Sequence, residues 1–285
     1  MNSHRIQNSL VAVAVFLSGL LVSGKAAAQV AAQPDTLVGA HVITTSYQLG
    51  VGGSDVLDTY LSRQRATGIA FTGLIISERQ KIGSRWSTVV QNQLRLSSNS
   101  DRNDHSTLFE ATYNFYFGRY FSWQLLDGRL NLQAGPSATL CLGVLHNRRS
   151  NANNPAQARL ALHVMPSGIA SWRFPLFRRQ WMLRYEFELP LVGLMFSPNY
   201  GQSYYEIFGK GNYDRNVVPT TFVSAPTFRQ QLTLRCNLGR TFTLSLGYLG
   251  DYQQAQVNSL KQHVISHNVM IGFVKRFQFI KHRPN

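Results

Sequence analysis

Asp104 and His105 form an adjacent pair whose residue types suggest catalysis, and they follow the polar stretch 98–103. A carboxylate can orient a neighbouring imidazole and let it act as a general base, which would suit hydrolysis of a peptide or a lipid. Acidic and histidine side chains in a polar loop are more commonly just solvated. The pair is therefore a weak catalytic candidate, and non-enzymatic roles are favoured.

A second group of charged residues follows the polar face of several alternating segments. Its members are Arg95, Glu110, Arg159, Arg184, Glu186, Glu188, Arg235 and Arg276. If these segments close around a common interior, the charges must be paired there, because an isolated buried charge is costly. The pattern predicts a polar ion-pair network that fills the interior. A narrow, anion-favouring pore lined by arginine is the alternative.

The longest non-alternating stretch, 196–226, is rich in tyrosine, glycine and asparagine. Its candidate binding residues are Tyr200, Tyr204, Tyr205, Glu206 and Tyr213. Aromatic side chains in such a loop could stack on a glycan, or the stretch could fold inward as a lid. The apolar side chains within it slightly favour the lid, since they would otherwise form an exposed patch.

No sequence motif predicts a cofactor. The cysteine and histidine spacing does not suggest zinc, and no phosphate loop or nucleotide fingerprint is present. We therefore expect no metal and no bound cofactor.

The elements that must position these residues are β-strands. In the eleven residues 107–117, aromatic or apolar and mostly polar side chains alternate with a period of two. This length suits a tilted strand that crosses a bilayer. Similar patterns predict ten strands, at 37–49, 67–79, 85–97, 107–117, 129–145, 159–172, 180–195, 227–238, 241–252 and 263–279.

The connections between these strands alternate in length. The longer ones are 50–66, 98–105, 147–156, 196–226 and 253–262, and the mostly shorter ones are 80–84, 119–128, 173–179 and 239–240. This alternation is typical of outer-membrane barrels, which have long outer loops and short periplasmic turns. We predict an all-β, antiparallel up-and-down transmembrane barrel of about ten strands. Twelve strands would result if 119–128 hid a further pair.

Aromatic residues near the strand ends favour the barrel over the alternative, a large secreted β-sandwich. The residues expected to form this girdle are Trp86, Tyr113, Phe117, Tyr120, Trp172, Trp181, Tyr248 and Phe279.

The first 28 residues predict a secretory signal peptide. A basic start precedes an apolar run, 10–22, and then Ala26-Ala27-Ala28, where cleavage is expected. The barrel domain would then be 29–285. The chain carries a formal charge of +15, which for an exported protein suits anionic lipid such as lipopolysaccharide rather than nucleic acid. The barrel assembly machinery is the other expected partner, and a glycan or small solute is a candidate ligand.

Three stretches resemble a known family. They are Gly52-Gly53-Ser54-Asp55 with the following residues to Ser62, then Asn153-Asn154-Pro155, and Ser203-Tyr204-Tyr205-Glu206-Ile207-Phe208. Together the chain resembles an uncharacterised outer-membrane β-barrel family of Bacteroidetes-type bacteria, known as a domain of unknown function. The resemblance implies an outer-membrane location and a barrel fold, and it implies no activity.

The sequence thus predicts an outer-membrane barrel with a structural role or a narrow, partly plugged pore. The alternative is an outer-membrane protease or lipid hydrolase with Asp104 and His105 at its rim.

Overall fold

The computed structural model describes residues 41–102, 107–149, 154–238 and 242–279. They form twelve strands and one π-helical turn, η2 (Tyr205–Gly209). The strands are β1 (His41–Asp58), β2 (Ser62–Lys81), β3 (Trp86–Asp101), β4 (Thr107–Leu125), β5 (Leu130–Asn147), β6 (Ala156–Leu176), β7 (Arg179–Glu188), β8 (Val192–Phe196), β9 (Val217–Thr221), β10 (Phe228–Asn237), β11 (Thr243–Val257) and β12 (Leu260–Phe279). Within these ranges no helix is long and apolar enough to cross a membrane.

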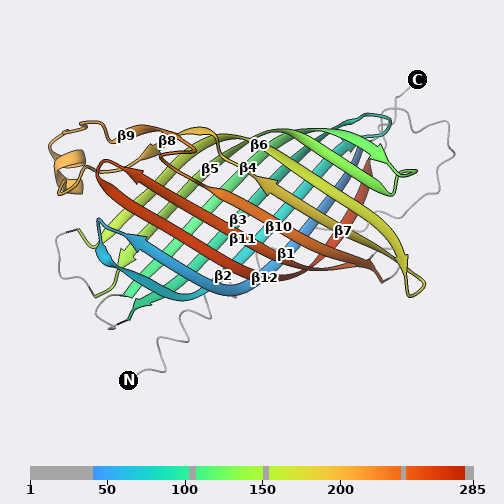
Figure 1. Cartoon of the computed structure of the whole chain (residues 1–285), viewed down its shortest axis with the longest axis horizontal. Helices are drawn as coiled ribbons and strands as arrows, with labels where there is room; N and C mark the ends of the chain where they lie inside the picture. Colours follow the sequence, from blue (N-terminus) through green and yellow to red (C-terminus); the bar gives the residue numbers. More distant parts are fainter. Residues whose placement is uncertain (1–40, 103–106, 150–153, 239–241, 280–285) are drawn as a thin grey trace. The chain divides into compact units, whose positions relative to one another are not determined.

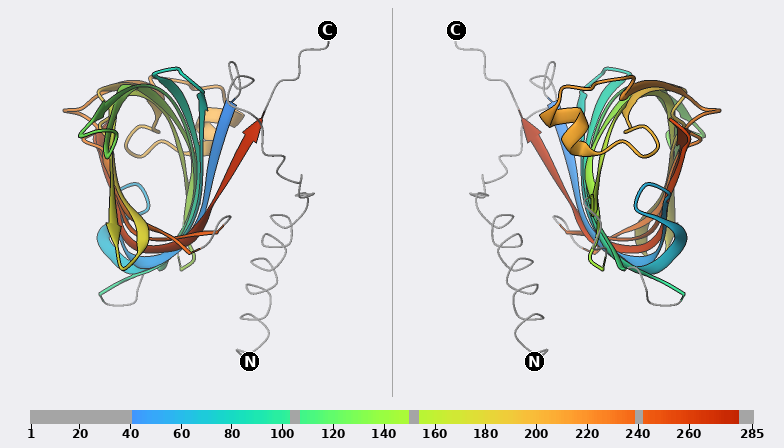
Figure 2. Two further views of the ribbon diagram at one scale, coloured as in Figure 1. Left: turned by 90° about the vertical axis from the view of Figure 1, so that its right-hand side faces the viewer. Right: turned by 90° about the vertical axis from the view of Figure 1, so that its left-hand side faces the viewer.

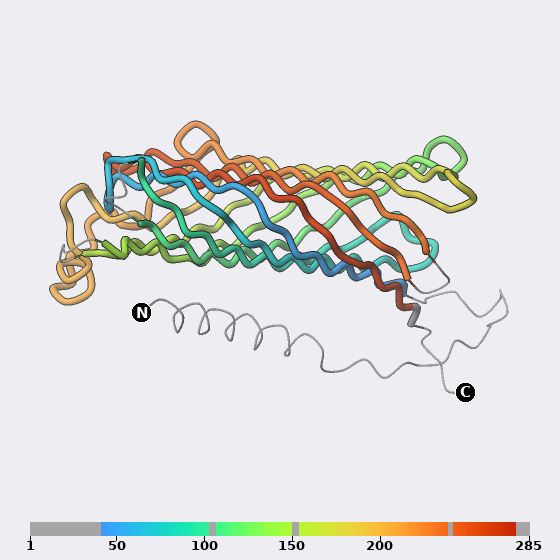
Figure 3. The backbone as a smooth tube through the Cα atoms, turned by 90° about the horizontal axis from the view of Figure 1, so that it is seen from below, coloured from blue at the N-terminus to red at the C-terminus, as the bar shows by residue number. Residues whose placement is uncertain are grey.

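The strands close into an antiparallel barrel (Figure 1). β1 pairs with β12 from His41↔Phe279 to Asp58↔Gln262, and β5 pairs with β6, which joins the remaining free edges. β7 and β8 both pair with β6, at different points along its length. β10 pairs with β7, and β9 pairs with β8. β7 and β8 therefore share one strand position in the wall, and β9 and β10 share the next. The result is the predicted barrel of ten strands. Figure 2 looks along it, and Figure 3 shows the strands inclined to its long axis.

The barrel has an apolar outside and a polar inside. The outward side chains around its middle include Leu49, Val51, Ile69, Phe71, Leu140, Leu142, Leu160, Leu162, Leu246, Val269 and Ile271, all at least 39% exposed. The inward side chains of the same strands are mostly Gln, Asn, Ser, Thr, Arg and Glu, and they are buried. This is the inverse of a water-soluble protein, and it is the arrangement of a barrel that spans a membrane.

The two ends of the barrel differ. We call the end that carries η2 the η2 end, and the opposite one, with the β4–β5 and β6–β7 turns, the hairpin end (Figure 1). Aromatic rings gather on the outer surface at the hairpin end. Trp86 and Trp123 both contact Phe121 edge-on, and Trp172 lies beside Phe174. Tyr120, which was predicted to belong to such a girdle, is instead 1% exposed and points into the lumen.

The predicted first connection, 50–66, is wrong. β1 continues through the glycine-rich motif to Asp58, and the connection to β2 is the short segment 59–61. Gly52 is required by a close approach to β12, because a Cβ there would lie 1.7 Å from the carbonyl oxygen of His267. Glycine in this motif therefore permits strand packing and does not mark a loop.

Two other predicted connections also differ from the structure. β11 and β12 are joined across Asn258 and Ser259, which have φ values of 50° and 60°. Positive φ values at both residues are typical of a tight two-residue hairpin turn. The predicted connection 253–262 is therefore mostly strand. At the hairpin end, β4 continues to Leu125 and a turn follows, so 119–128 contains no additional strand pair.

The predicted strand 180–195 is interrupted. β7 ends at Glu188, β8 begins at Val192, and Pro190 lies between them. Proline has no N–H to donate to a ladder, which explains the break. The neighbouring wall position is interrupted at the same level, between β9 and β10.

Candidate functional site

The centre of the lumen is crossed by an ion pair. Arg95 on β3 is 0% exposed, and its Nη2 lies 2.7 Å from Oε1 of Glu110 on the adjacent strand β4. Its Nη1 donates to Oδ2 of Asp251 at 2.8 Å. Asp251 belongs to β11. Along the wall, three strands lie between β3 and β11, namely β2, β1 and β12. The Arg95 side chain therefore bridges opposite parts of the lumen.

A second cluster, centred on Arg229 of β10, lies beside the first. Its Nε donates to Oε1 of Gln93 at 3.0 Å and its Nη2 to Oε1 of Gln91 at 3.1 Å, and both glutamines are on β3. Its Nη1 donates to Oε2 of Glu188 at 3.3 Å. The guanidinium also lies 4.7 Å from the centre of the Tyr116 ring. Both the charge and the flat face of Arg229 are thus in contact with lumen side chains.

A third cluster lies closer to the hairpin end. Arg184 on β7 donates to Oε2 of Glu78 on β2 and to Oε2 of Glu186, each at 3.2 Å. Gln133 on β5 donates to the other Glu78 oxygen at 2.8 Å. Arg235 is also buried, but among the described atoms its Nε has no hydrogen-bond partner.

Opposite charges accompany one another in these clusters. Arg95, Arg184, Arg229 and Arg235, with Arg159 beside Glu110, lie among five carboxylates, Glu78, Glu110, Glu186, Glu188 and Asp251. Removing charges from water is costly unless opposite charges and hydrogen bonds replace the solvent. Because every one of these carboxylates faces an arginine, the network is suited to closing the lumen and leaves none of the five as an unpaired base.

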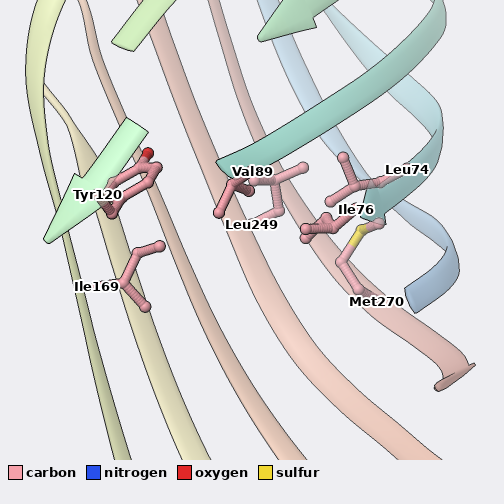
Figure 4. Packing of buried hydrophobic residues seen from close by; sticks show 7 residues of the cluster. All are labelled: Leu74, Ile76, Val89, Tyr120, Ile169, Leu249 and Met270. Atoms are coloured by element: carbon pink, nitrogen blue, oxygen red, sulfur yellow. The ribbon is translucent and has the colours of Figure 1, made fainter. Parts of the chain in front are cut away.

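An apolar layer completes the filling near the hairpin end. Leu74, Ile76, Val89, Leu249 and Met270 pack together inside the barrel, and Tyr120 on β4 and Ile169 on β6 complete the cluster (Figure 4). Tyr120 shares a hydrogen bond of 2.6 Å with Ser167. The sequence-based expectation of a polar, partly plugged lumen did not include this layer.

The stretch that contains η2 lies over the other end of the lumen. Ile207 in η2 is fully buried, whereas Tyr205 and Phe208 are more than 60% exposed. Tyr204 and Phe208 stack 6.0 Å apart, and Phe196 at the end of β8 stacks with Phe208. We refer to residues 197–216 as the η2 loop.

The η2 loop is held by contacts to three separate parts of the rim. Tyr204 donates to Oε1 of Gln157 at 3.0 Å and accepts from the backbone N–H of Ala158 at 2.7 Å. Tyr60, between β1 and β2, donates to the carbonyl oxygen of Gln202 at 3.0 Å. Asn258, between β11 and β12, donates to the carbonyl oxygen of Ser197 at 3.0 Å. The loop thus spans the mouth.

Two titrating groups of the η2 loop report on this anchoring. Burial raises the pKa of Tyr204 to about 12. Glu206 is half-buried, and hydrogen bonds from the backbone N–H and the hydroxyl of Ser203 lower its pKa below the usual value. In return, the Glu206 N–H donates to the Ser203 hydroxyl at 3.1 Å, a reciprocal cap of the helical turn.

The structure places most of the sequence-predicted site residues in these clusters. Arg95, Glu110, Arg159, Arg184, Glu186, Glu188 and Arg235 are buried in the lumen, but Arg276 lies near the end of β12 and is exposed. Of the loop residues, Tyr204 anchors the η2 loop, Tyr200 accepts from Arg63 at 2.9 Å, and Tyr213 is 65% exposed. Asp104 and His105 lie outside the described residues, so the hydrolase hypothesis stays a prediction.

Sequence reasoning missed three charged members of the network, Glu78, Arg229 and Asp251. Arg229 has the same parity as Arg235 on β10, so strand alternation could have placed it in the lumen. Asp251 shares its parity with Leu249, which belongs to the apolar layer, so no polar face was visible there. The clusters contain no set of three or more His, Cys, Asp or Glu side chains that could hold a metal, and the other described residues contain none either.

Comparisons with known proteins identify a family and add no activity. The family model described as "Protein of unknown function (DUF3316)" matches residues 10–284. No curated protein matches the sequence.

Several solved structures are similar over most of the chain. The transport unit of the autotransporter AIDA-I from Escherichia coli covers 94% of this chain and 97% of its own, with 5% identity and a TM-score of 0.44. The outer membrane protease OmpT from Escherichia coli covers 87% and 99%, with 8% identity and a TM-score of 0.43. Neisserial surface protein A covers 84% and 99%, with 10% identity and a TM-score of 0.37. Similarities this distant say nothing about activity.

Proposed function

The chain belongs to the DUF3316 family of unknown function, and from its lumen we propose that it is an outer-membrane barrel closed to free diffusion. One observation carries this proposal. Arg95 is entirely buried while it joins β3 and β4 to β11 across the lumen. A water-filled pore through the same place would have to separate these groups, which are stable there only when paired.

Two further features support closure. Arg229 and the glutamines of β3 fill the space next to Arg95, and the apolar layer lies beyond them toward the hairpin end. The η2 loop would then act as a lid over the outer mouth. On this proposal the barrel serves as a scaffold in the envelope, and the narrow anion-favouring pore is the competing function.

We also propose how the barrel is oriented and assembled. The described wall begins at His41 and ends at Phe279, both at the hairpin end, which we assign to the periplasm because barrel termini usually lie there. The signal peptide 1–28 would direct export, and the barrel assembly machinery would insert the chain. Exposed Arg63 and Lys261 near the η2 end would contact lipopolysaccharide. The Bacteroidetes-type origin also stays a prediction.

Conductance in planar bilayers tests the closed lumen. We expect protein that is shown to be folded, by its heat-modifiable migration on gels, to give no stable current steps. A variant in which Arg95, Arg159, Glu110 and Asp251 are all replaced by alanine should conduct, because it removes the central bridge together with equal numbers of positive and negative charges. Stable, anion-selective steps from the unmodified protein would instead establish the narrow pore.

A further inference from the structure

The regular hydrogen-bond ladder of the barrel wall is interrupted on one side. Residues 189–191 separate β7 from β8, and residues 222–227 separate β9 from β10, so the ladder between these neighbours is interrupted. β11 pairs with β10 only as far as Tyr252, and in the described pairings its last residues, 253–257, pair with β12 alone. A seam therefore runs between 222–227 and the end of β11.

Small apolar side chains close this seam. Met195, Ala225, Ala255 and Val257 form a buried cluster, with Val218 against it. One backbone hydrogen bond crosses here, from the N–H of Gln256 to the carbonyl oxygen of Ser224 at 2.8 Å. Separating such contacts breaks far fewer hydrogen bonds than separating a paired ladder.

The seam lies between an internal cavity and an external groove. The cavity has a volume of about 50 Å³ and is bounded by lumen residues together with Pro190 and Ala225 of the seam. The groove on the outer surface has a volume of about 410 Å³. Thr227 and Gln254 line both. Only these side chains and their neighbours therefore separate the groove from the lumen.

The cavity contains buried polar atoms without partners. Nη1 of Arg159, both amide atoms of Asn114 and Oε1 of Gln262 make no hydrogen bond among the described atoms, although all three side chains are more than nine-tenths buried. The closest ion-pair partner of Arg159 is Glu110, at 3.8 Å from that same nitrogen. Buried polar atoms are normally satisfied, so these groups are available to hydrogen-bond a polar head group or water in the cavity.

The groove offers the opposite chemistry. Phe222, Pro226, Phe228 and Tyr252 line it, and Phe228 and Tyr252 stack 6.1 Å apart. This surface belongs to the outside of the barrel, where the proposed function places lipid. An apolar chain could lie there without leaving the membrane.

We propose that the seam is a lateral binding site for a single-chain amphipath with a carboxylate head. This inference rests on the proposed membrane location. The head enters the cavity and pairs with Arg159 and Asn114, and the hydrocarbon tail lies in the groove. Arginine presents two parallel N–H donors that match a carboxylate. The cavity has room for a head of a few heavy atoms, and the groove suits one chain, so a sugar or a two-chain phospholipid does not fit.

Binding of decanoate to the detergent-refolded protein, measured by calorimetry at pH 8, tests this site. Arg159→Gln should weaken decanoate binding about tenfold or more, and Arg159→Lys should restore part of it, since a charged hydrogen bond is lost and partly regained. Thr227→Trp should block access from the groove. Leu246→Trp places the same ring on an exposed lipid-facing position of β11 and is the matched control, with binding expected to stay within about twofold.

The competing outcomes are distinct. Equal affinity for decanoate and 1-decanol would overturn the carboxylate assignment, and binding that Arg159→Gln and Thr227→Trp both leave unchanged would overturn the site. A diazirine-bearing decanoate should crosslink within 222–230 or 252–254, and labelling only elsewhere would contradict the proposal. Because conductance tests the closed lumen separately, a silent barrel that does not bind decanoate would reject this inference alone.

Discussion

Nη1 of Arg95 and Oδ2 of Asp251 lie 2.8 Å apart although their strands, β3 and β11, are not neighbours in the wall. A contact of this kind can form only after the barrel has closed. It therefore ties the stability of the closed barrel to a few buried charges, and the effect of removing one of them can be measured.

Replacing Arg95 with alanine should strongly destabilise the barrel. The change leaves Glu110 and Asp251 without their shared cation, and breaking a buried pair in this way typically costs about 3–5 kcal/mol. Urea unfolding in detergent, followed by gel mobility, measures the loss. Arg119→Ala removes an exposed arginine on β4 and serves as the control. Equal urea midpoints for Arg95→Ala and the unmodified protein would contradict a structural role for the pair.

Gly52 and Gly53 should respond differently to alanine. A Cβ at Gly52 would meet the His267 carbonyl oxygen at 1.7 Å, whereas a Cβ at Gly53 would have nothing within 4 Å. Overpacking usually costs about 1–3 kcal/mol, and here it falls on the pairing of β1 with β12 that closes the barrel. We expect a lower folded yield for Gly52→Ala and a normal one for Gly53→Ala, as measured by heat-modifiable migration. If both variants fold equally well, the close approach does not limit closure.

Tyr204→Phe should loosen the η2 loop. The variant loses the bond to Gln157 and leaves the Ala158 N–H without its acceptor, at a local cost of about 1–3 kcal/mol. Hydrogen exchange of residues 197–216 should become faster. Tyr205→Phe is the matched control, because the Tyr205 ring is 69% exposed and its described ring contact is with Lys210. Unchanged exchange in Tyr204→Phe would mean that other contacts hold the loop.

The η2 loop should also loosen in acid. The pKa of Glu206 is lowered in the folded protein by its hydrogen bonds with Ser203. A lowered carboxyl pKa stabilises the folded loop above the ordinary value of about 4.3, and this contribution is lost as the pH falls through the lowered pKa. Hydrogen exchange in the loop, corrected for the intrinsic rate at each pH, should therefore speed up below about pH 4. In Glu206→Gln this extra acid dependence should be absent. If it persists there, another group is responsible.

The sequence predicted the architecture but misplaced some boundaries. Period-two alternation predicted ten strands, because every membrane-spanning strand must present one face to the lipid and the other face to the lumen. Glycine misled the prediction at Gly52, where it serves close packing between strands, and polar residues misled it at 253–262. In both places a strand has the amino-acid composition of a loop. The neighbouring strand that pairs with it cannot be identified from the local sequence.

Parity also identified most of the buried charges, since a strand residue's face follows from its position. It could not pair them, since Arg95 lies 156 residues from Asp251. Asp251 was missed because β11 showed no clear polar face, whereas Arg229 could have been found from its parity with Arg235.

By itself, the sequence determined that this chain forms a barrel with apolar outer and largely polar inner faces, because alternation is a local property of each strand. Only the tertiary structure decided which charges meet across the lumen, that an apolar layer and the η2 loop accompany them, and that the pairing of β10 with β11 stops at Tyr252. These features depend on register, closure and the matching of interruptions in neighbouring strands, and all three arise only when distant segments are brought together.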